Sequence, residues 1–363
     1  MTSGLGSLPD FPWDSLAPYA DKARAHPDGI VDLSVGTPVD ATPDVVRRAL
    51  ADASDAPGYP LTAGAPALRE AIAAWLGRRF GAAVDPAAVL PVIGTKELVA
   101  WLPTLLEASA VGYPSLAYPT YDVGARIAGA RGTVVDATVS VGPERLDLLW
   151  VNSPSNPTGA VLPAEHLRKV ADWARDRGTV VASDECYADL YYGGEAPASV
   201  LSPQVCDGRH EGLLAVHSMS KRSNLAGYRA GFVAGDPALI TRLLEVRKHA
   251  GMIVPAPVQA AMIAALGDDE HVVVQRRRYE ARRSILLAAL RDVGFTIDDT
   301  GAGLYLWSTR DEDCWETVGW LAERGILAAP GSFYGAAGAR HVRVALTATD
   351  ERVAAAASRL MGA

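Results

Sequence analysis

The chain has 363 residues, which exceeds the size at which one hydrophobic core usually stops growing and therefore favours two packed domains. Apolar residues make up 49% and charged residues 21% of the sequence, a balance typical of a folded globular protein and unlike a disordered or fibrous chain. The net charge of -8 argues against a broad basic face for nucleic acid, although a small basic pocket remains compatible with it.

The cysteines and the N-terminal residues indicate the cellular compartment of the protein. Cys186, Cys206 and Cys314 are far apart and show no CxxC or Cys/His spacing, so we expect no disulfide framework, no metal and a reducing cytoplasmic location. Residues 1–16 lack a basic stretch followed by an apolar one, and no window approaches the roughly 20 apolar residues of a membrane span. We expect neither an export signal nor a membrane partner.

Helical and strand patterns alternate along the first 250 residues. Thr42 and Pro43 read as the cap and first residue of the first expected helix. Expected helices cover 45–53, 65–80, 97–106, 164–177 and 237–248, and expected strands cover 89–93, 148–151, 179–183, 213–217 and 230–234. This alternation predicts an α/β domain with a largely parallel sheet between helices.

The pattern changes at residues 251–257, which read GMIVPAP and precede two further helices, the second long and arginine-rich over 270–291. Short elements follow, namely strands at 304–307, 326–329 and 341–345 and helices at 315–324 and from 350. We therefore expect an N-terminal segment over 1–35 that packs with the small domain, a large domain over 36–250 and a small α+β domain over 251–363.

The most informative stretch, SMSKRSNLAGYR at 218–229, follows the expected strand 213–217, at the kind of strand end where open α/β sheets bind ligands. It resembles the lysine motif of fold-type I pyridoxal 5'-phosphate (PLP) aminotransferases. The resemblance makes Lys221 the residue that binds the cofactor covalently, and Ser218 and Arg229 the residues that hold its phosphate. A phosphate dianion favours hydroxyl and guanidinium donors, and the lysine amine must be neutral to attack an aldehyde.

Two other strand ends extend the resemblance. Asp184 follows the strand 179–183 and matches the family's catalytic aspartate, which keeps the cofactor's ring nitrogen protonated so that the ring accepts electrons. Tyr187, also assigned to catalysis, and Asn156, within NSPSNPTG at 152–159, match residues that bind the cofactor's 3'-oxygen. Taken alone, the Asn-Pro and Thr-Gly pairs are equally well explained as turn formers.

A helix start and an aromatic run supply further cofactor contacts. The backbone N–H groups that follow Gly94 form an anion site at a helix N-terminus, and the resemblance assigns Thr95 and Lys96 to the phosphate. Tyr118 matches the aromatic residue that stacks on the cofactor ring, with Tyr121 as the second choice. A place in the hydrophobic core is the alternative for either tyrosine.

The resemblance also implies substrate and subunit contacts. Arg343, in a strand, matches the arginine that binds the substrate α-carboxylate through a bidentate pair. Gly36 matches a glycine whose backbone meets the same carboxylate, because it has no Cβ, and Asn156 joins these substrate-binding residues. Tyr59 matches a tyrosine that reaches the phosphate of a neighbouring subunit, which implies a homodimer with shared active sites.

Three stretches, FPWDSLAPY at 11–19, HPDGIVDLSVGTP at 26–38 and GTKELVAWLP at 94–103, are similar to actinobacterial N-succinyldiaminopimelate aminotransferases. That similarity implies transfer of the amino group of glutamate to N-succinyl-2-amino-6-ketopimelate, on the route to diaminopimelate and lysine. Both small-molecule substrates carry more than one carboxylate. The distal carboxylate needs its own donor, and the sequence leaves four candidates open: Lys22, Arg24, Arg222 and Arg340.

Other functions remain compatible with the same motifs. Another amino-acid aminotransferase, of the aspartate or aromatic type, or a PLP-dependent C-S lyase would use the same residues, because the cofactor stabilises any carbanion. A more distant alternative is the PLP-sensing half of a transcription regulator. About 35 residues before Gly36 are too few for a winged helix-turn-helix with its linker, and the acidic charge balance disfavours DNA.

Overall fold

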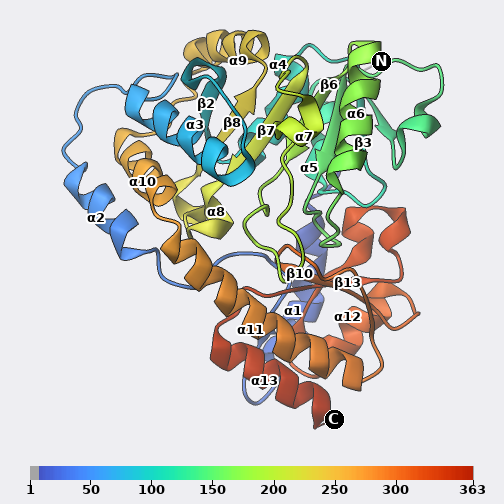
Figure 1. Ribbon diagram of the computed structural model, residues 1–363. Helices are drawn as coiled ribbons and strands as arrows, with labels where there is room; N and C mark the ends of the chain where they lie inside the picture. Colours follow the sequence, from blue (N-terminus) through green and yellow to red (C-terminus); the bar gives the residue numbers. More distant parts are fainter. Residues whose placement is uncertain (1–7, 363) are drawn as a thin grey trace.

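The computed structural model describes residues 8–362, which form a large domain and a small domain (Figure 1). Within these residues the large domain holds a seven-stranded sheet. Its strand order is β2 (Val89–Ile93), β8 (Ala230–Gly235), β7 (Leu213–Ser218), β6 (Val180–Asp184), β5 (Leu148–Asn152), β3 (Ala110–Tyr113) and β4 (Arg131–Val134). β8 runs antiparallel to both of its neighbours and the other pairs are parallel, so the expected mostly parallel α/β sheet is confirmed.

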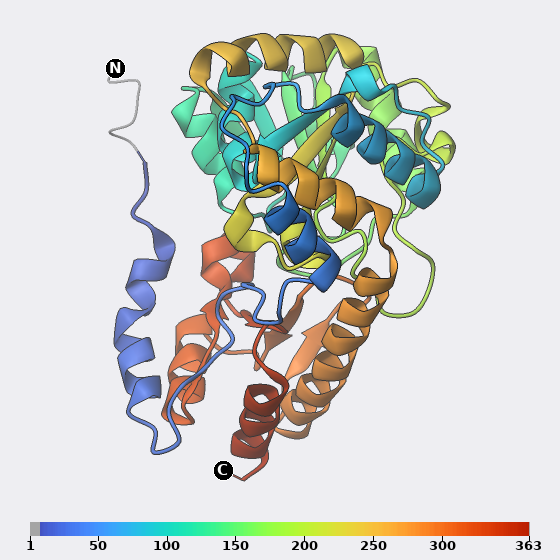
Figure 2. The same cartoon turned by 90° about the vertical axis from the view of Figure 1, so that its left-hand side faces the viewer.

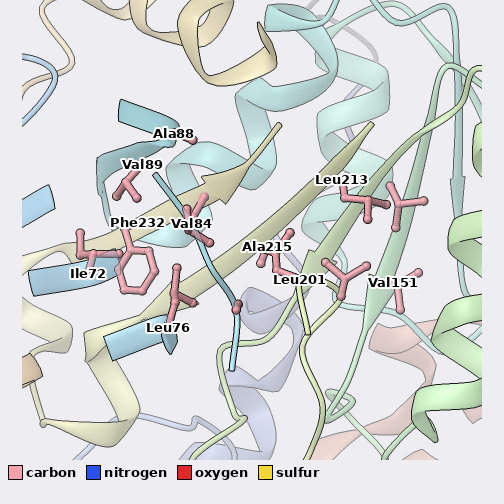
Figure 3. Close-up of a cluster of buried hydrophobic side chains, with 14 of the residues drawn as sticks. Ile72, Leu76, Val84, Ala88, Val89, Val151, Leu201, Leu213, Ala215 and Phe232 are labelled. Carbon is pink, nitrogen blue, oxygen red and sulfur yellow. The ribbon is translucent and has the colours of Figure 1, made fainter. Parts of the chain in front are cut away.

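Helices cover both faces of this sheet. One face packs against α3 (Pro66–Phe80), α6 (Ala164–Arg177) and α10 (Ala256–Gly267), and the other against α4 (Thr95–Leu105), α5 (Thr120–Ile127) and α9 (Pro237–Ala250). Figure 3 shows part of the first core, where Ile72 and Leu76 of α3 lie beside Phe232 of β8. Burial of each such side chain contributes about 1.5–3 kcal/mol, which explains why the central strands read as continuous apolar runs.

The small domain is built on an antiparallel sheet. Its strand order is β12 (Ala329–Pro330), β13 (Val342–Ala345), β10 (Tyr305–Thr309) and β9 (Thr296–Asp298). The helices α11 (Glu270–Asp292), α12 (Cys314–Glu323) and α13 (Asp350–Met361) belong to the same domain, and α11 runs diagonally across it in Figure 1. The predicted α+β character of this domain therefore agrees with the structure.

The N-terminal segment lies along the small domain (Figure 2). α1 (Ala17–Arg24) follows a short 3-10 helix at Pro12–Leu16 and packs on α12, and Leu16 and Ala20 join the small-domain core. β1 (Val31–Asp32) pairs in parallel with β11 (Ile326–Leu327). Residues between Leu16 and Asp32 therefore contact the small domain, while the segment bounds 1–35 stay a prediction and residues 1–7 lie outside the described part of the chain.

Several local expectations differ from the structure. Thr42 does not cap the first expected helix, because α2 (Asp44–Asp52) begins after Pro43 and the Thr42 hydroxyl donates instead to the carbonyl of Asn224 at 3.2 Å. The single strand expected at 326–329 is two short strands, β11 and β12, that belong to different sheets.

The edge strand β4 was not expected from the sequence, because its residues are largely exposed and offer no apolar run. α10 packs on α2 and α3 although it follows the predicted boundary at residue 251, so that boundary stays a prediction. In the part of the chain from 8 to 362, every helix is too short or too polar to cross a membrane.

Candidate active site

The carboxyl ends of three neighbouring strands bring the predicted site residues together. Asn152 ends β5, Asp184 ends β6 and Ser218 ends β7, and Asn152 and Asp184 are partners in register. The four-residue helix α8 (Met219–Arg222) follows β7 directly and carries Lys221. Because parallel strands present their carboxyl ends at one edge of the sheet, these side chains share one site.

The Lys221 side chain is half-buried, and its amine donates a hydrogen bond to the carbonyl of Gly36. Burial lowers the pKa of Lys221, and the positive charges of Arg343 and Arg229 lower it further, against the opposing effects of Tyr305 and Cys186. A lowered pKa increases the fraction of neutral amine near pH 7. Lys221 is therefore prepared to act as a nucleophile and as a base.

The Asp184 carboxylate is buried between two hydrogen-bond donors. The Tyr121 hydroxyl donates to Oδ2 at 2.8 Å and the Cys186 backbone N–H donates to Oδ1 at 3.2 Å. Burial raises the pKa of Asp184, while these donors and the Cys186 thiol oppose the rise. The Tyr121 ring stacks on the Trp150 ring, with the ring centres 4.9 Å apart, while its hydroxyl contacts Asp184. The Tyr118 ring lies edge-on to the Tyr121 ring, with the ring centres 5.9 Å apart.

The start of α4 and the Arg229 guanidinium form an anion-binding corner. Gly94, with φ +72°, precedes α4, and a Cβ at that position would come within 2.7 Å of the guanidinium carbon of Arg229. The backbone N–H groups of Thr95 and Lys96 open the helix, which favours a phosphate there. The Lys96 side chain points elsewhere: it is exposed, and its ammonium lies 5.5 Å from the ring centre of Phe11.

Arg343 lies in β13 and is almost completely buried, with 3% of its surface exposed. Its Nη1 donates to Asn156 Oδ1 at 3.0 Å and its Nη2 donates to the carbonyl of Ser34 at 2.7 Å. Its Nε has no hydrogen-bond partner among residues 8–362. The guanidinium is thus held in one orientation and keeps donors for a carboxylate.

Tyr305 is a site residue that the sequence analysis missed. Its hydroxyl lies 3.2 Å from that of Tyr187, and the Arg343 guanidinium carbon lies 3.8 Å from its ring centre. Tyr305 belongs to the small domain, 118 residues from Tyr187, so no local motif joins the two. The one available signal is its place on a strand that pairs with the strand of Arg343.

Comparison with known proteins identifies the family to which this site belongs. The family model described as "Aminotransferase class I and II" matches residues 28–360. The chain belongs to this family. Class I and II aminotransferases depend on PLP and act on small molecules.

Similar members of the family carry different names. The chain is 61% identical to the 4-dedimethylamino-4-oxo-anhydrotetracycline transaminase OxyQ of Streptomyces rimosus, over 98% of this chain and 100% of the relative. It is 64% identical to the probable aminotransferase Rv1178 of Mycobacterium tuberculosis, over 98% of this chain and 85% of the relative. A solved structure titled probable N-succinyldiaminopimelate aminotransferase, from Thermus thermophilus, is 32% identical with a TM-score of 0.87, and covers 97% of this chain and 100% of that one.

The side chains at this aminotransferase site fit PLP chemically. The Asp184 carboxylate suits a protonated ring nitrogen, the Lys221 amine suits an aldehyde, and the Tyr187 hydroxyl suits the 3'-oxygen. The corner made by α4 and Arg229 suits the phosphate, and a side chain at Gly94 would close it. Residues 8–362 offer no cluster of His, Cys, Asp and Glu side chains arranged to hold a metal ion.

The four sequence candidates for a distal carboxylate are each paired outside this site. Arg222 is buried and donates to Asp189 at 2.6 Å. The other three pair with neighbouring acidic side chains: Lys22 with Glu323, Arg24 with Asp21, and Arg340 with Asp311. The structure therefore argues against all four in that role. Tyr59 is 99% exposed, and its contact with a second subunit stays a prediction.

Proposed function

We propose that this aminotransferase moves the amino group of glutamate to N-succinyl-2-amino-6-ketopimelate. One observation carries the reaction type: a half-buried amine, a buried carboxylate and a buried guanidinium, from Lys221, Asp184 and Arg343, converge on one site. The acceptor is proposed on the similarity of residues 11–19, 26–38 and 94–103 to N-succinyldiaminopimelate aminotransferases and on the name of the Thermus thermophilus relative.

Each residue has a defined task in this proposal. PLP, when bound, supplies an electron sink for the carbanion formed at the substrate α-carbon. Lys221 would anchor the cofactor until the substrate amine displaces it, and its freed Nζ would then move the α-proton to C4' in the first half-reaction and make the reverse transfer in the second. Asp184 holds a proton on the ring nitrogen, and Tyr121 keeps that carboxylate in place through its 2.8 Å hydrogen bond.

The remaining contacts orient the cofactor and the substrate. Ser218, Arg229 and the first N–H groups of α4, from Thr95 and Lys96, bind the phosphate. Tyr187 and Asn156 bind the 3'-oxygen, and Tyr118 stacks on the ring. Arg343 and Gly36 bind the α-carboxylate, and Asn156 holds Arg343 through its 3.0 Å hydrogen bond.

Lys96 is our candidate for the distal carboxylate. Its backbone N–H faces the phosphate corner, but its ammonium is exposed and lies beside Phe11, within one of the stretches on which the substrate proposal depends. Within residues 8–362, no acidic side chain forms a salt bridge with it. A free cation at that place suits an extended dicarboxylic substrate.

A second acceptor is favoured by a specific observation. The chain is 61% identical over nearly its whole length to a transaminase named for 4-dedimethylamino-4-oxo-anhydrotetracycline. That compound is therefore the second candidate acceptor. We propose glutamate as the amino donor for either acceptor.

We further propose a cytoplasmic homodimer with shared active sites. Tyr59 is 99% exposed and nearby Leu61 is 62% exposed, which suits residues that a second copy covers. Sedimentation of the PLP-loaded protein tests the dimer. A Tyr59→Phe variant that loses PLP affinity without unfolding would support the shared site.

The decisive experiment supplies glutamate with each acceptor in turn and measures 2-oxoglutarate and the aminated product by mass spectrometry. Equal amounts of both products with the succinylated keto acid are expected, and Lys221→Ala is the inactive control. Product from the tetracycline intermediate alone would transfer the proposal to that acceptor. Pyruvate released from cystathionine without 2-oxoglutarate would replace the aminotransferase proposal with the lyase.

A further inference from the structure

Tyr305 is a buried small-domain residue whose hydroxyl reaches the cofactor side of the site. Only 5% of its surface is exposed. Its hydroxyl lies 3.2 Å from the Tyr187 hydroxyl, and a Cβ on Gly36 would overlap the same oxygen. The Gly36 carbonyl accepts the hydrogen bond from Lys221, so Gly36 contacts both the Tyr305 hydroxyl and the Lys221 amine.

The ring of Tyr305 contacts the carboxylate side of the site. The Arg343 guanidinium carbon is 3.8 Å from the ring centre, well within the range of a cation–π contact. Tyr334 lies farther from the same guanidinium carbon, at 4.8 Å. One side chain therefore touches Tyr187 and Gly36 with its hydroxyl and Arg343 with its ring.

The charges around Tyr305 agree with this arrangement. Burial by itself would raise the pKa of Tyr305, but the positive charges of Arg343 and Lys221 and the hydrogen bond with Tyr187 leave it lowered. In the opposite direction, Tyr305 acts to raise the pKa of Lys221. The phenol and the amine are thus electrostatically linked as well as close.

We propose that Tyr305 is a positioning residue that couples the two halves of the site, because its hydroxyl orients Tyr187 and Gly36 while its ring holds the Arg343 guanidinium flat. This inference rests on the proposed roles of Lys221, Tyr187 and Arg343. A tyrosine kept only for packing in the small-domain core would be replaceable by phenylalanine without effect on the chemistry.

Two substitutions separate the hydroxyl from the ring. Tyr305→Phe keeps the ring and removes the oxygen, whereas Tyr305→Leu removes the ring as well. Tyr334→Phe is the matched control, because the Tyr334 ring also faces Arg343 but its buried hydroxyl has no hydrogen-bond partner among residues 8–362. Thermal unfolding of each variant measures any loss of stability separately.

The readouts are the pH midpoint of the absorbance of the lysine-bound cofactor, the affinity for succinate, which has no amino group to react, and kcat against KM for glutamate. Tyr305→Phe should shift the midpoint, because the Tyr187 hydroxyl loses its partner at 3.2 Å, and should lower kcat about 3- to 10-fold with little change in KM. Tyr305→Leu should in addition weaken succinate binding about 5- to 30-fold. Tyr334→Phe should match the wild type in all three.

The inference is overturned if Tyr305→Phe has the wild-type midpoint and kcat while Tyr187→Phe changes both. Tyr305→Leu with unchanged succinate affinity would also overturn the role of the ring, and Tyr305→Phe still tests the hydroxyl if the leucine variant does not fold. A wild-type protein that binds PLP without forming the lysine-bound chromophore would overturn the proposed function and this inference with it. The first two patterns overturn the inference alone.

Discussion

Replacing Arg343 by lysine should weaken the binding of both α-carboxylate substrates while leaving the cofactor in place. The guanidinium offers five N–H donors, of which one goes to Asn156 and one to the Ser34 carbonyl. An ammonium has three donors, so it can serve those two acceptors and only one oxygen of the substrate. One of the two charge-assisted hydrogen bonds of the bidentate pair is therefore lost.

Loss of that bond costs about 1.5–3 kcal/mol, which corresponds to about a 10- to 150-fold decrease in kcat/KM. The decrease should be similar for glutamate and for the keto acid, because both bind through the α-carboxylate. Steady-state kinetics with each substrate measures it, and the absorbance of the lysine-bound cofactor checks that PLP binding is unchanged.

Arg340→Lys is the matched control, since Arg340 is exposed, pairs with Asp311 and undergoes the same substitution three residues away on the chain. It should stay within about two-fold of the wild type. If Arg343→Lys loses less than about three-fold in kcat/KM, the α-carboxylate does not bind there and the substrate must enter in another orientation.

Four further predictions test other parts of the site. Lys221→Ala should lose about 10⁴-fold or more in turnover together with the lysine-bound chromophore, which a visible spectrum and a rate assay measure. Asp184→Asn should lower kcat about 10²- to 10³-fold while PLP still binds, as measured by equilibrium dialysis and kinetics. Gly36→Ala should lower kcat/KM about 10²-fold, because the new Cβ would displace the Tyr305 hydroxyl; a normal rate would contradict the close approach. Because burial lowers the pKa of Lys221, the cofactor-free protein should lose stability as the pH falls from the ordinary lysine value to that lowered value, with no further loss from this group below it, and Lys221→Met should remove this dependence in urea unfolding.

The part of the site that could be predicted from the sequence lies at strand ends. Asp184 and Ser218 each end a buried strand of the sheet, and Lys221 follows within three residues, so a local pattern placed all of them. The order of parallel strands then brings their side chains together without further information. The strands could also be predicted from the sequence, because β5, β7 and β8 are buried at every position and therefore consist largely of apolar residues.

The contacts that could not be predicted join distant segments. Tyr305 contacts Tyr187 across 118 residues, and Arg222 pairs with Asp189 across 33 residues. No local sequence pattern therefore indicates that Tyr305 belongs to the site or that Arg222 is paired away from it. The role of Tyr121 beside Asp184 likewise depends on how α5 packs on the sheet. Charge made Arg222 one of four unranked candidates for the distal carboxylate, whereas its burial and its pairing with Asp189 give it a structural role in the large domain.

We infer that the choice of acceptor can change independently of the chemistry, because the residues assigned to the chemistry and the N-terminal segment lie in different parts of the molecule. Lys221 and Asp184 lie in the large domain, whereas Trp13 lies on the N-terminal segment, which packs on the small domain that also carries Arg343. The Trp13 ring is 5.2 Å from that of Phe333 and 6.5 Å from that of Tyr334, which in turn faces Arg343. We therefore expect substitutions at Trp13 or Phe333 to change the acceptor without a change at the cofactor, as relatives that share a fold carry names for different substrates.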